Sequence, residues 1–90
     1  MELKDTIELM NSPDYKERFK AEYYQTKLRY EKLKAFNAKI EAARSTAYTK
    51  TKVTMPVHDC PDELLREQQS VMCNYLHILE LRAIIEGVEL

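Results

Sequence analysis

Apolar side chains recur along the chain with the spacing of α-helices. The first of them, four and then three positions apart, are Leu3, Ile7 and Met10. This spacing predicts a short helix over about residues 2–11. Ser12 and Pro13 then interrupt the pattern. Because Ser12 is a good N-cap and proline suits the first helical position, a second helix is predicted to begin at Pro13 and to span about residues 13–44.

The second predicted helix is long for a small protein. Its apolar seam alternates spacings of four and three through Phe19, Tyr23, Thr26, Tyr30, Leu33, Asn37 and Ile40. No proline or glycine falls between Asp14 and Arg44. The helix therefore covers about 30 residues, or roughly 45 Å, whereas helices in globular proteins average about 12 residues. A helix of this length needs a partner helix along most of its surface.

The remaining residues predict a loop and a third helix. Within residues 45–60, every second position from Thr49 to Val57 is a threonine, valine or methionine. No second strand is available to pair with this segment, so we expect a loop over residues 45–60. A helix is predicted over about residues 61–86, beginning at Pro61 and ending with Gly87 as its C-cap. One stripe of this helix consists of Leu64, Gln68, Val71, Tyr75, Ile78, Arg82 and Ile85, and beside it lie Leu65, Met72 and Leu79.

The composition supports a helical protein that gains stability by association. One glycine and three prolines are too few for the turns of an all-β fold. A chain of this length buries only about 60–65% of the surface that its unfolded form exposes, so a homo-oligomer is expected. We predict one all-α domain covering residues 1–90: a short N-terminal helix followed by a long antiparallel helical hairpin, in an oligomer.

Charge and hydropathy exclude several classes of partner. Fourteen basic and fifteen acidic residues give a net charge of −1, without the basic excess that is typical of DNA- or RNA-binding proteins. No apolar run approaches the roughly 20 residues that cross a membrane. The N-terminus lacks the features of a signal peptide. We therefore expect a cytosolic protein with no membrane partner, whose two cysteines are reduced thiols.

Few residues suggest catalysis or metal binding. Cys73 and His77 share a helix face, and His58 and Cys60 precede that helix, a ligand set that zinc accepts. However, the stretch between Cys60 and Cys73 is about 13 residues, or nearly 20 Å of helix. The Cys–His pair also lacks an orienting acid for nucleophilic catalysis. We expect no metal and no other cofactor, and we predict that the chain is not an enzyme.

Tyrosines and cations alternate along residues 15–34. The tyrosines are Tyr15, Tyr23, Tyr24 and Tyr30, and the cations are Lys16, Arg18, Lys20, Lys27, Arg29, Lys32 and Lys34. Aromatic faces stack on nucleobases, while guanidinium and ammonium groups hold phosphates. The same pattern arises when tyrosines fill a helical seam and the cations are solvated. The pattern alone leaves both interpretations open.

Motifs on both long helices carry a resemblance to a known family. They are Arg18-Phe19-x-x-Glu22, Arg29-x-x-Lys32-Leu33-x-x-Phe36, and Leu64-Leu65-Arg66-x-Gln68 followed by Met72, Tyr75 and Leu79. Over about residues 12–83 the chain resembles the helical hairpin of the phage anti-CBASS protein 2 family, which anti-Thoeris protein 1 shares. Thr26, Tyr30 and Asn37 depart from the family pattern, because related hairpins more often carry aliphatic residues there.

The resemblance implies a sponge for second messengers. Such proteins bind cyclic dinucleotides such as cyclic GMP-AMP, and in some cases cyclic trinucleotides, without cleaving them. They act in the cytoplasm of the infected bacterial host, where they block CBASS immune signalling. The family assembles as compact hexamers with ligands bound between chains. The alternative is a helical adaptor or structural protein with no nucleotide ligand.

Helix geometry also favours a site between chains. Tyr15 and Tyr30 are about 22 Å apart along one helix, which is roughly twice the size of a cyclic dinucleotide. One chain therefore cannot bring both tyrosines to the same ligand. We predict that Tyr15 stacks on a base and that Tyr30 of a neighbouring chain supplies a second aromatic contact.

The other predicted ligand-binding residues surround these tyrosines. Lys16, Arg29 and Lys32 are the candidate phosphate partners, and Ser12 closes the site. Arg66 is the candidate for a separate cyclic-trinucleotide site near the third helix. Arg29, Lys32 and Arg66 lie on the family motifs, whereas the other residues rest on their own chemistry.

Overall fold

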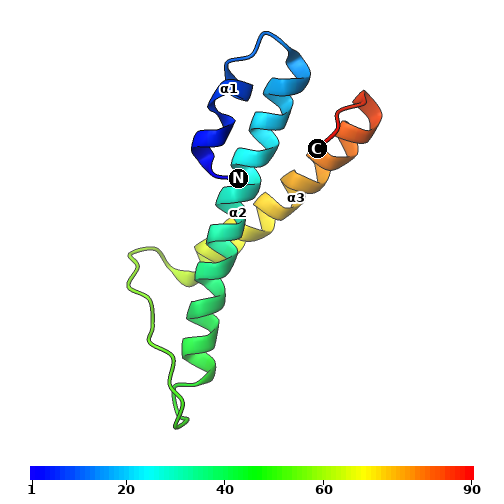
Figure 1. Ribbon diagram of the computed structural model, residues 1–90. Helices are drawn as coiled ribbons and strands as arrows, with labels where there is room; N and C mark the ends of the chain where they lie inside the picture. Colours follow the sequence, from blue (N-terminus) through cyan, green and yellow to red (C-terminus); the bar gives the residue numbers. More distant parts are fainter.

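The protein is a set of helices joined by short turns and one long loop (Figure 1). The computed structural model describes residues 1–90. A 3₁₀ turn, η1 (Leu3–Thr6), leads into α1 (Ile7–Met10), which is followed by α2 (Tyr15–Ser45) and α3 (Asp62–Glu86). There is no strand. The predicted all-α class is confirmed.

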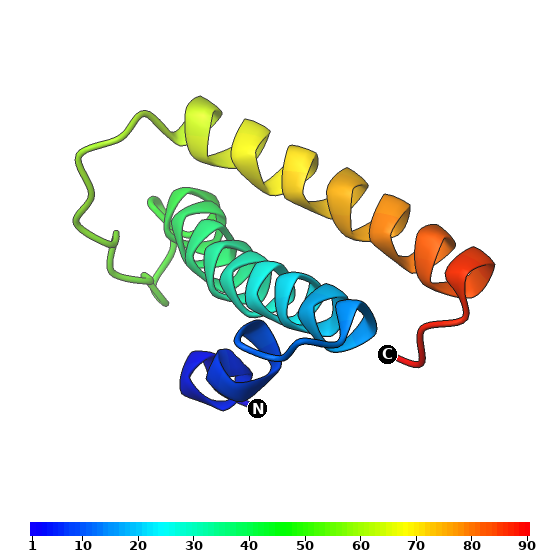
Figure 2. The ribbon, with the colours of Figure 1, turned by 90° about the horizontal axis from the view of Figure 1, so that it is seen from above.

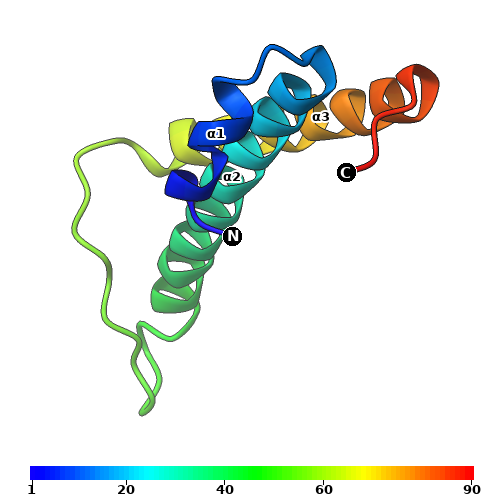
Figure 3. The ribbon, with the colours of Figure 1, turned by 45° about the horizontal axis from the view of Figure 1, so that its top comes forward.

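Helix α2 is the central element of the fold. Figures 2 and 3 show α1 on one side of α2 and α3 on the other, and α1 does not contact α3. Helices α2 and α3 run antiparallel, so that Asn37 contacts Gln69 near one end of their seam and Tyr15 contacts Glu86 at the other. The molecule is elongated, with extents of 54 × 25 × 21 Å. The N-terminal end of α2 therefore lies beside the C-terminal end of α3.

Helix α2 begins at Tyr15 and not at Pro13, so this part of the sequence prediction is wrong. Asp14 is the N-cap, and its side chain accepts a hydrogen bond from the Lys16 amide at 3.0 Å. Ser12 instead accepts a hydrogen bond from the Asp14 amide at 3.1 Å. A carboxylate caps as well as a hydroxyl and also interacts favourably with the positive end of the helix dipole. Ser12 consequently stabilises the turn that precedes the helix.

The C-terminal end of α3 is closed by Gly87, as the sequence predicts. Gly87 has φ 71° and ψ 36°, in the left-handed region that glycine adopts without strain. The next amide, that of Val88, donates a hydrogen bond to the Ala83 carbonyl at 2.8 Å. This turn folds the Val88 side chain back into the core.

The hydrophobic core is thin and lies between α2 and α3. It consists of Phe19, Tyr23, Leu76, Leu79, Ala83 and Val88. All seven positions of the predicted α2 seam are buried or half-buried, so that prediction is confirmed. Only 11 of the 90 residues are buried. The isolated chain therefore has the small stability margin expected for its length.

Helix α3 packs on α2 with a face adjacent to the stripe that begins at Leu64. Its buried and half-buried inner positions are Leu65, Gln69, Met72, Leu76, Leu79 and Ala83. The stripe from Leu64 to Ile85 is exposed, and Val71, Ile78 and Ile85 keep 59%, 52% and 82% of their surface. The two stripes have the same helical spacing, so periodicity cannot show which of them faces α2. Leu79, which is 0% exposed, marks the packed face.

A polar side chain, Asn37, interrupts the apolar seam and ties the two helices together. It is 8% exposed, and its Nδ2 donates to the Leu65 carbonyl at 3.2 Å and to Gln69 Oε1 at 2.8 Å. Its Oδ1 has no hydrogen-bond partner. A buried polar group of this kind favours one register of two helices at some cost in stability. We infer that Asn37 specifies the register at this end of the hairpin.

Residues 46–61 form the loop between the long helices, and side-chain contacts hold the chain near both ends of this loop. The Thr46 hydroxyl accepts a hydrogen bond from the Val53 amide at 3.0 Å. At the other end, His58 lies edge-on to the Phe36 ring at 5.7 Å, and its Nε2 is 3.2 Å from Asp62 Oδ1. The loop therefore returns to the start of α3 through a contact with α2.

The core between α2 and α3 yields a stability prediction. Leu79→Ala should lower the free energy of unfolding by about 3 kcal/mol, because it removes a fully buried side chain and leaves a cavity. Val57→Ala, in the loop, should change it by less than about 0.5 kcal/mol, because Val57 is 97% exposed. Urea unfolding followed by circular dichroism measures both. Equal losses for the two variants would contradict the assigned core.

Candidate functional site

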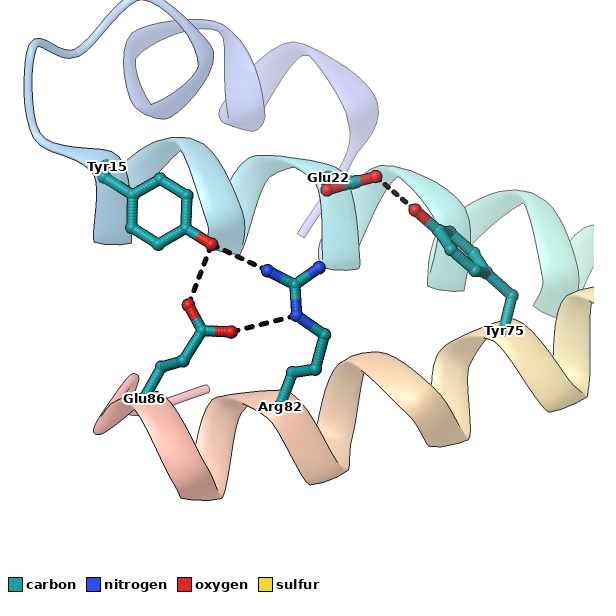
Figure 4. A network of polar contacts seen from close by, with 5 residues as sticks. All are labelled: Tyr15, Glu22, Tyr75, Arg82 and Glu86. Atoms are coloured by element: carbon teal, nitrogen blue, oxygen red, sulfur yellow. Dashed lines mark hydrogen bonds and ion pairs between the residues drawn. The ribbon is translucent and has the colours of Figure 1, made fainter.

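Tyr15, the first residue of α2, has its hydroxyl held by two residues of α3 (Figure 4). The hydroxyl donates a hydrogen bond to Glu86 Oε1 at 2.8 Å and accepts one from Arg82 Nη2 at 2.8 Å. Arg82 Nε in turn donates to Glu86 Oε2 at 2.9 Å. Each of the three side chains therefore bonds both of the others.

The charges of this cluster stabilise one another. The hydrogen bonds from Tyr15 and Arg82 lower the pKa of the Glu86 carboxyl. The hydrogen bond to Glu86 raises the pKa of the Tyr15 hydroxyl, and the same carboxylate raises the pKa of the Arg82 guanidinium. At neutral pH the phenol is consequently neutral, the carboxylate ionised and the guanidinium charged.

Lys16 and Ser12 lie at the same end of the hairpin as Tyr15. The Lys16 ammonium donates a hydrogen bond to the Gly87 carbonyl at 3.2 Å, at the negative end of α3. The Ser12 carbonyl accepts a hydrogen bond from Arg18 Nη1 at 2.9 Å. The structure therefore brings together three of the predicted site residues.

A groove between α2 and α3 contains two other predicted residues, Tyr30 and Arg66. Its volume is about 710 Å³, within the range of small-molecule sites. The residues that line it include Tyr30, Lys34, Asn37, Arg44, Asp62, Arg66 and Cys73. Lys34 Nζ lies 5.9 Å from the centre of the Tyr30 ring, and the Arg44 guanidinium pairs with Asp62. The groove thus combines an aromatic ring with cations.

The predicted residues do not form one site within the chain. Arg29 and Lys32 are exposed on α2 and do not line the groove. Tyr15 and Tyr30 lie on the same uninterrupted helix, which separates them by about 22 Å. A ligand that contacts both tyrosines would have to lie between two chains.

Two residues of the Tyr15 cluster, Arg82 and Glu86, were not among the predicted site residues. The sequence places Arg82 only in the stripe of α3 that begins at Leu64. The sequence does predict the ion pair between Arg82 and Glu86, because residues four apart are adjacent on one face of a helix. What the sequence does not show is that Tyr15 meets this pair, because that contact depends on the register of α2 against α3.

The histidines and cysteines considered for zinc lie in separate places. His58 contacts Asp62 and the Cys60 carbonyl at the start of α3, whereas Cys73 lies in the groove wall. No group of three or more histidine, cysteine, aspartate or glutamate side chains lies close enough to hold a metal ion. Cys60 and Cys73 are free thiols.

Fold and site together define a class of protein: an elongated α-helical hairpin that presents tyrosines and cations at two separate places. No helix is long and apolar enough to cross a membrane. A family model, Sequestin, matches residues 13–85, so the chain belongs to the Sequestin family. Comparisons with curated proteins and with solved structures give no match.

The lowered pKa of Glu86 gives the Tyr15 cluster a pH dependence. A carboxyl whose pKa is lower in the folded state contributes stability above its unfolded pKa and loses it as the pH falls through the folded value. The wild type should therefore be more stable than Glu86→Gln at pH 7, and the difference should shrink as the pH falls below the ordinary glutamate pKa of about 4.3. Urea midpoints across this range measure the effect.

Glu89→Gln provides the control for the pH series. Glu89 is exposed and forms no hydrogen bond or ion pair in the structure. This variant should match the wild type across the whole pH range. A Glu86→Gln curve that also matched the wild type would show that the cluster is absent in solution.

Proposed function

We propose that this protein is a non-catalytic phage sponge, which binds cyclic dinucleotides such as cyclic GMP-AMP and blocks CBASS signalling in the cytoplasm of the infected host. The main support is membership of the Sequestin family over residues 13–85, a family name that is compatible with sequestering a ligand. The motifs shared with the anti-CBASS protein 2 family support the choice of ligand. Cyclic trinucleotides are proposed as a second ligand class at Arg66.

The positions of the tyrosines support binding between chains. Tyr15 and Lys16 lie at one end of the seam, and Tyr30 lies further along α2 at a groove that also contains Arg66. In a head-to-tail pair of chains, Tyr15 of one chain meets Tyr30 of its partner. Arg29 and Lys32, exposed on α2, are available to its phosphates.

The exposed face of α3 supports assembly. Leu64, Val71, Ile78 and Ile85 repeat every seven residues and keep between 52% and 82% of their surface. Such a continuous apolar face is typical of a protein interface, and the heptad spacing suits another helix. We propose that copies of this chain cover the face, in the hexamer that the family resemblance implies.

Protonation states in the Tyr15 cluster favour binding over catalysis. A general acid or base works best with a pKa near the operating pH. Here the pKa values of Tyr15 and Arg82 are raised and that of Glu86 is lowered, so all three move away from neutrality. These side chains are therefore suited to keep fixed protonation states and not to exchange protons with a ligand.

A helical adaptor is the second candidate, and the exposed stripe of α3 is the observation that favours it. In that case a different protein, and not a second copy, would cover Val71 and Ile78. The ligand experiment below separates the two functions, because an adaptor has no reason to bind a nucleotide.

Calorimetry with cyclic GMP-AMP tests the proposed function. The wild type should bind tightly, and ligand recovered after denaturation should be intact, because the protein holds it without chemistry. Tyr15→Ala should lose most of the affinity, since stacking on one base is worth about 1–3 kcal/mol. Altered ligand would instead indicate an enzyme. Absence of heat at micromolar protein would rule out cyclic GMP-AMP as the ligand.

Light scattering tests the assembly. The wild type should have a mass several times that of one chain, and Ile78→Asp should reduce it, because a charge would be buried in the interface. Val57→Asp, at an equally apolar but isolated loop position, should keep the wild-type mass. A monomeric wild type would contradict both the assembly and the site between chains.

A further inference from the structure

The hydroxyl of Tyr15 is restrained to an unusual degree for a side chain at the surface. Its hydrogen is donated to Glu86 and one of its lone pairs accepts from Arg82, both at 2.8 Å. Because the hydroxyl oxygen lies on the axis about which the ring rotates, these two contacts fix the direction in which the ring axis points, and contacts of the ring itself set its plane. Figure 4 shows the phenol pointing from α2 toward these two residues of α3.

Arg82, which donates a hydrogen bond to the Tyr15 hydroxyl, also packs against the core. The Arg82 guanidinium lies 5.2 Å from the centre of the Phe19 ring, and Phe19 is 3% exposed. The Tyr15 ring meets the same Phe19 ring in a T-shaped arrangement, with centroids 6.2 Å apart. Tyr15 is therefore positioned at two points, by its hydroxyl and by the contact of its ring with Phe19.

The Tyr15 ring nevertheless stays open to solvent. Tyr15 is 47% exposed, whereas Tyr23, which also donates its hydroxyl to a glutamate of α3, is 5% exposed. Tyr23 therefore serves packing alone. Tyr15 combines a held hydroxyl with an available aromatic face, the combination that suits stacking on a nucleobase.

We propose that Arg82 and Glu86 are positioning residues, which hold the Tyr15 ring in the orientation that receives the base of the ligand. This role rests on the proposed function, because it concerns the same site. Its physical basis is preorganisation: a ring that is already oriented loses less side-chain entropy when the base stacks on it. The hydroxyl then contributes to affinity without touching the ligand.

Removing the hydroxyl while keeping the ring is the direct test. Tyr15→Phe removes both hydrogen bonds of the hydroxyl and should weaken binding of cyclic GMP-AMP by roughly 3- to 10-fold, because the ring must then be ordered when the ligand binds. Tyr15→Ala should lose far more. Tyr23→Phe is the matched control, because it removes the same kind of contact, to Glu80 at 2.6 Å, from a buried ring of the same helix. It should bind as the wild type does. Unchanged affinity in Tyr15→Phe would overturn the proposal.

A double-mutant cycle separates positioning from a general structural role. Arg82→Met should weaken binding to a similar extent, but it should have no further effect in the Tyr15→Phe background, because both changes break the same contact. Equal losses in both backgrounds would overturn the proposal. Light scattering on each variant shows that the assembly is unchanged when affinity is compared.

A measurement without ligand distinguishes failure of this inference from failure of the proposed function. In ¹³C-tyrosine NMR, assigned with Tyr15→Phe, Glu86→Gln should lower the pKa of Tyr15 toward its ordinary value, because the carboxylate raises it. If the wild type binds no cyclic dinucleotide but this shift occurs, the contact is real and the proposed function is wrong. If the shift does not occur, Glu86 does not hold the ring and the positioning role is wrong.

Discussion

The packing of α3 against α2 is the constraint on which the other features of this protein depend. A helix in a protein gains most of its stability by packing its apolar face against another element, and α3 is the element that covers most of the seam of the 31-residue helix α2. Leu79 and Phe19 anchor the packing in the core, and Asn37 ties its other end to α3. Because both helices are rigid, the register set by these contacts also determines which residues of α3 meet Tyr15.

Much of the fold could be predicted from the sequence because its local signals agree. Asn11-Ser12-Pro13 marks the break before α2, and the left-handed Gly87 marks the end of α3. The long run without proline or glycine between Asp14 and Arg44 predicts that α2 is continuous. The α2 seam was also predictable, since a single apolar stripe crosses that helix. The sequence is ambiguous where two signals compete. Ser12 and Asp14 are both suitable N-caps, and α3 carries two adjacent apolar stripes.

The candidate site was less predictable, because it depends on pairing between helices. Tyr15 and Lys16 could be proposed as ligand-binding residues from their side-chain chemistry. The rise of the helix also showed that Tyr15 and Tyr30 of one chain cannot contact the same ligand. The contact between Tyr15 and the Arg82–Glu86 pair could not be predicted, because Tyr15 and Arg82 are 67 residues apart in the sequence. A shift of α3 by one turn would place Arg82 against a different residue of α2. The contacts that organise the site are thus a consequence of the core.

The two stripes of α3 connect the site to the assembly. The inner stripe, through Leu76 and Leu79, is satisfied within the chain, while the outer stripe keeps Val71 and Ile78 exposed. Arg82 belongs to the outer stripe by spacing, yet its guanidinium turns toward α2 and bonds the Tyr15 hydroxyl. A neighbouring chain that packs on the outer stripe would therefore cover the same helix face that orients the tyrosine. In such an assembly the second chain would shield the Arg82–Glu86 pair from water, which strengthens its hydrogen bonds to the Tyr15 hydroxyl.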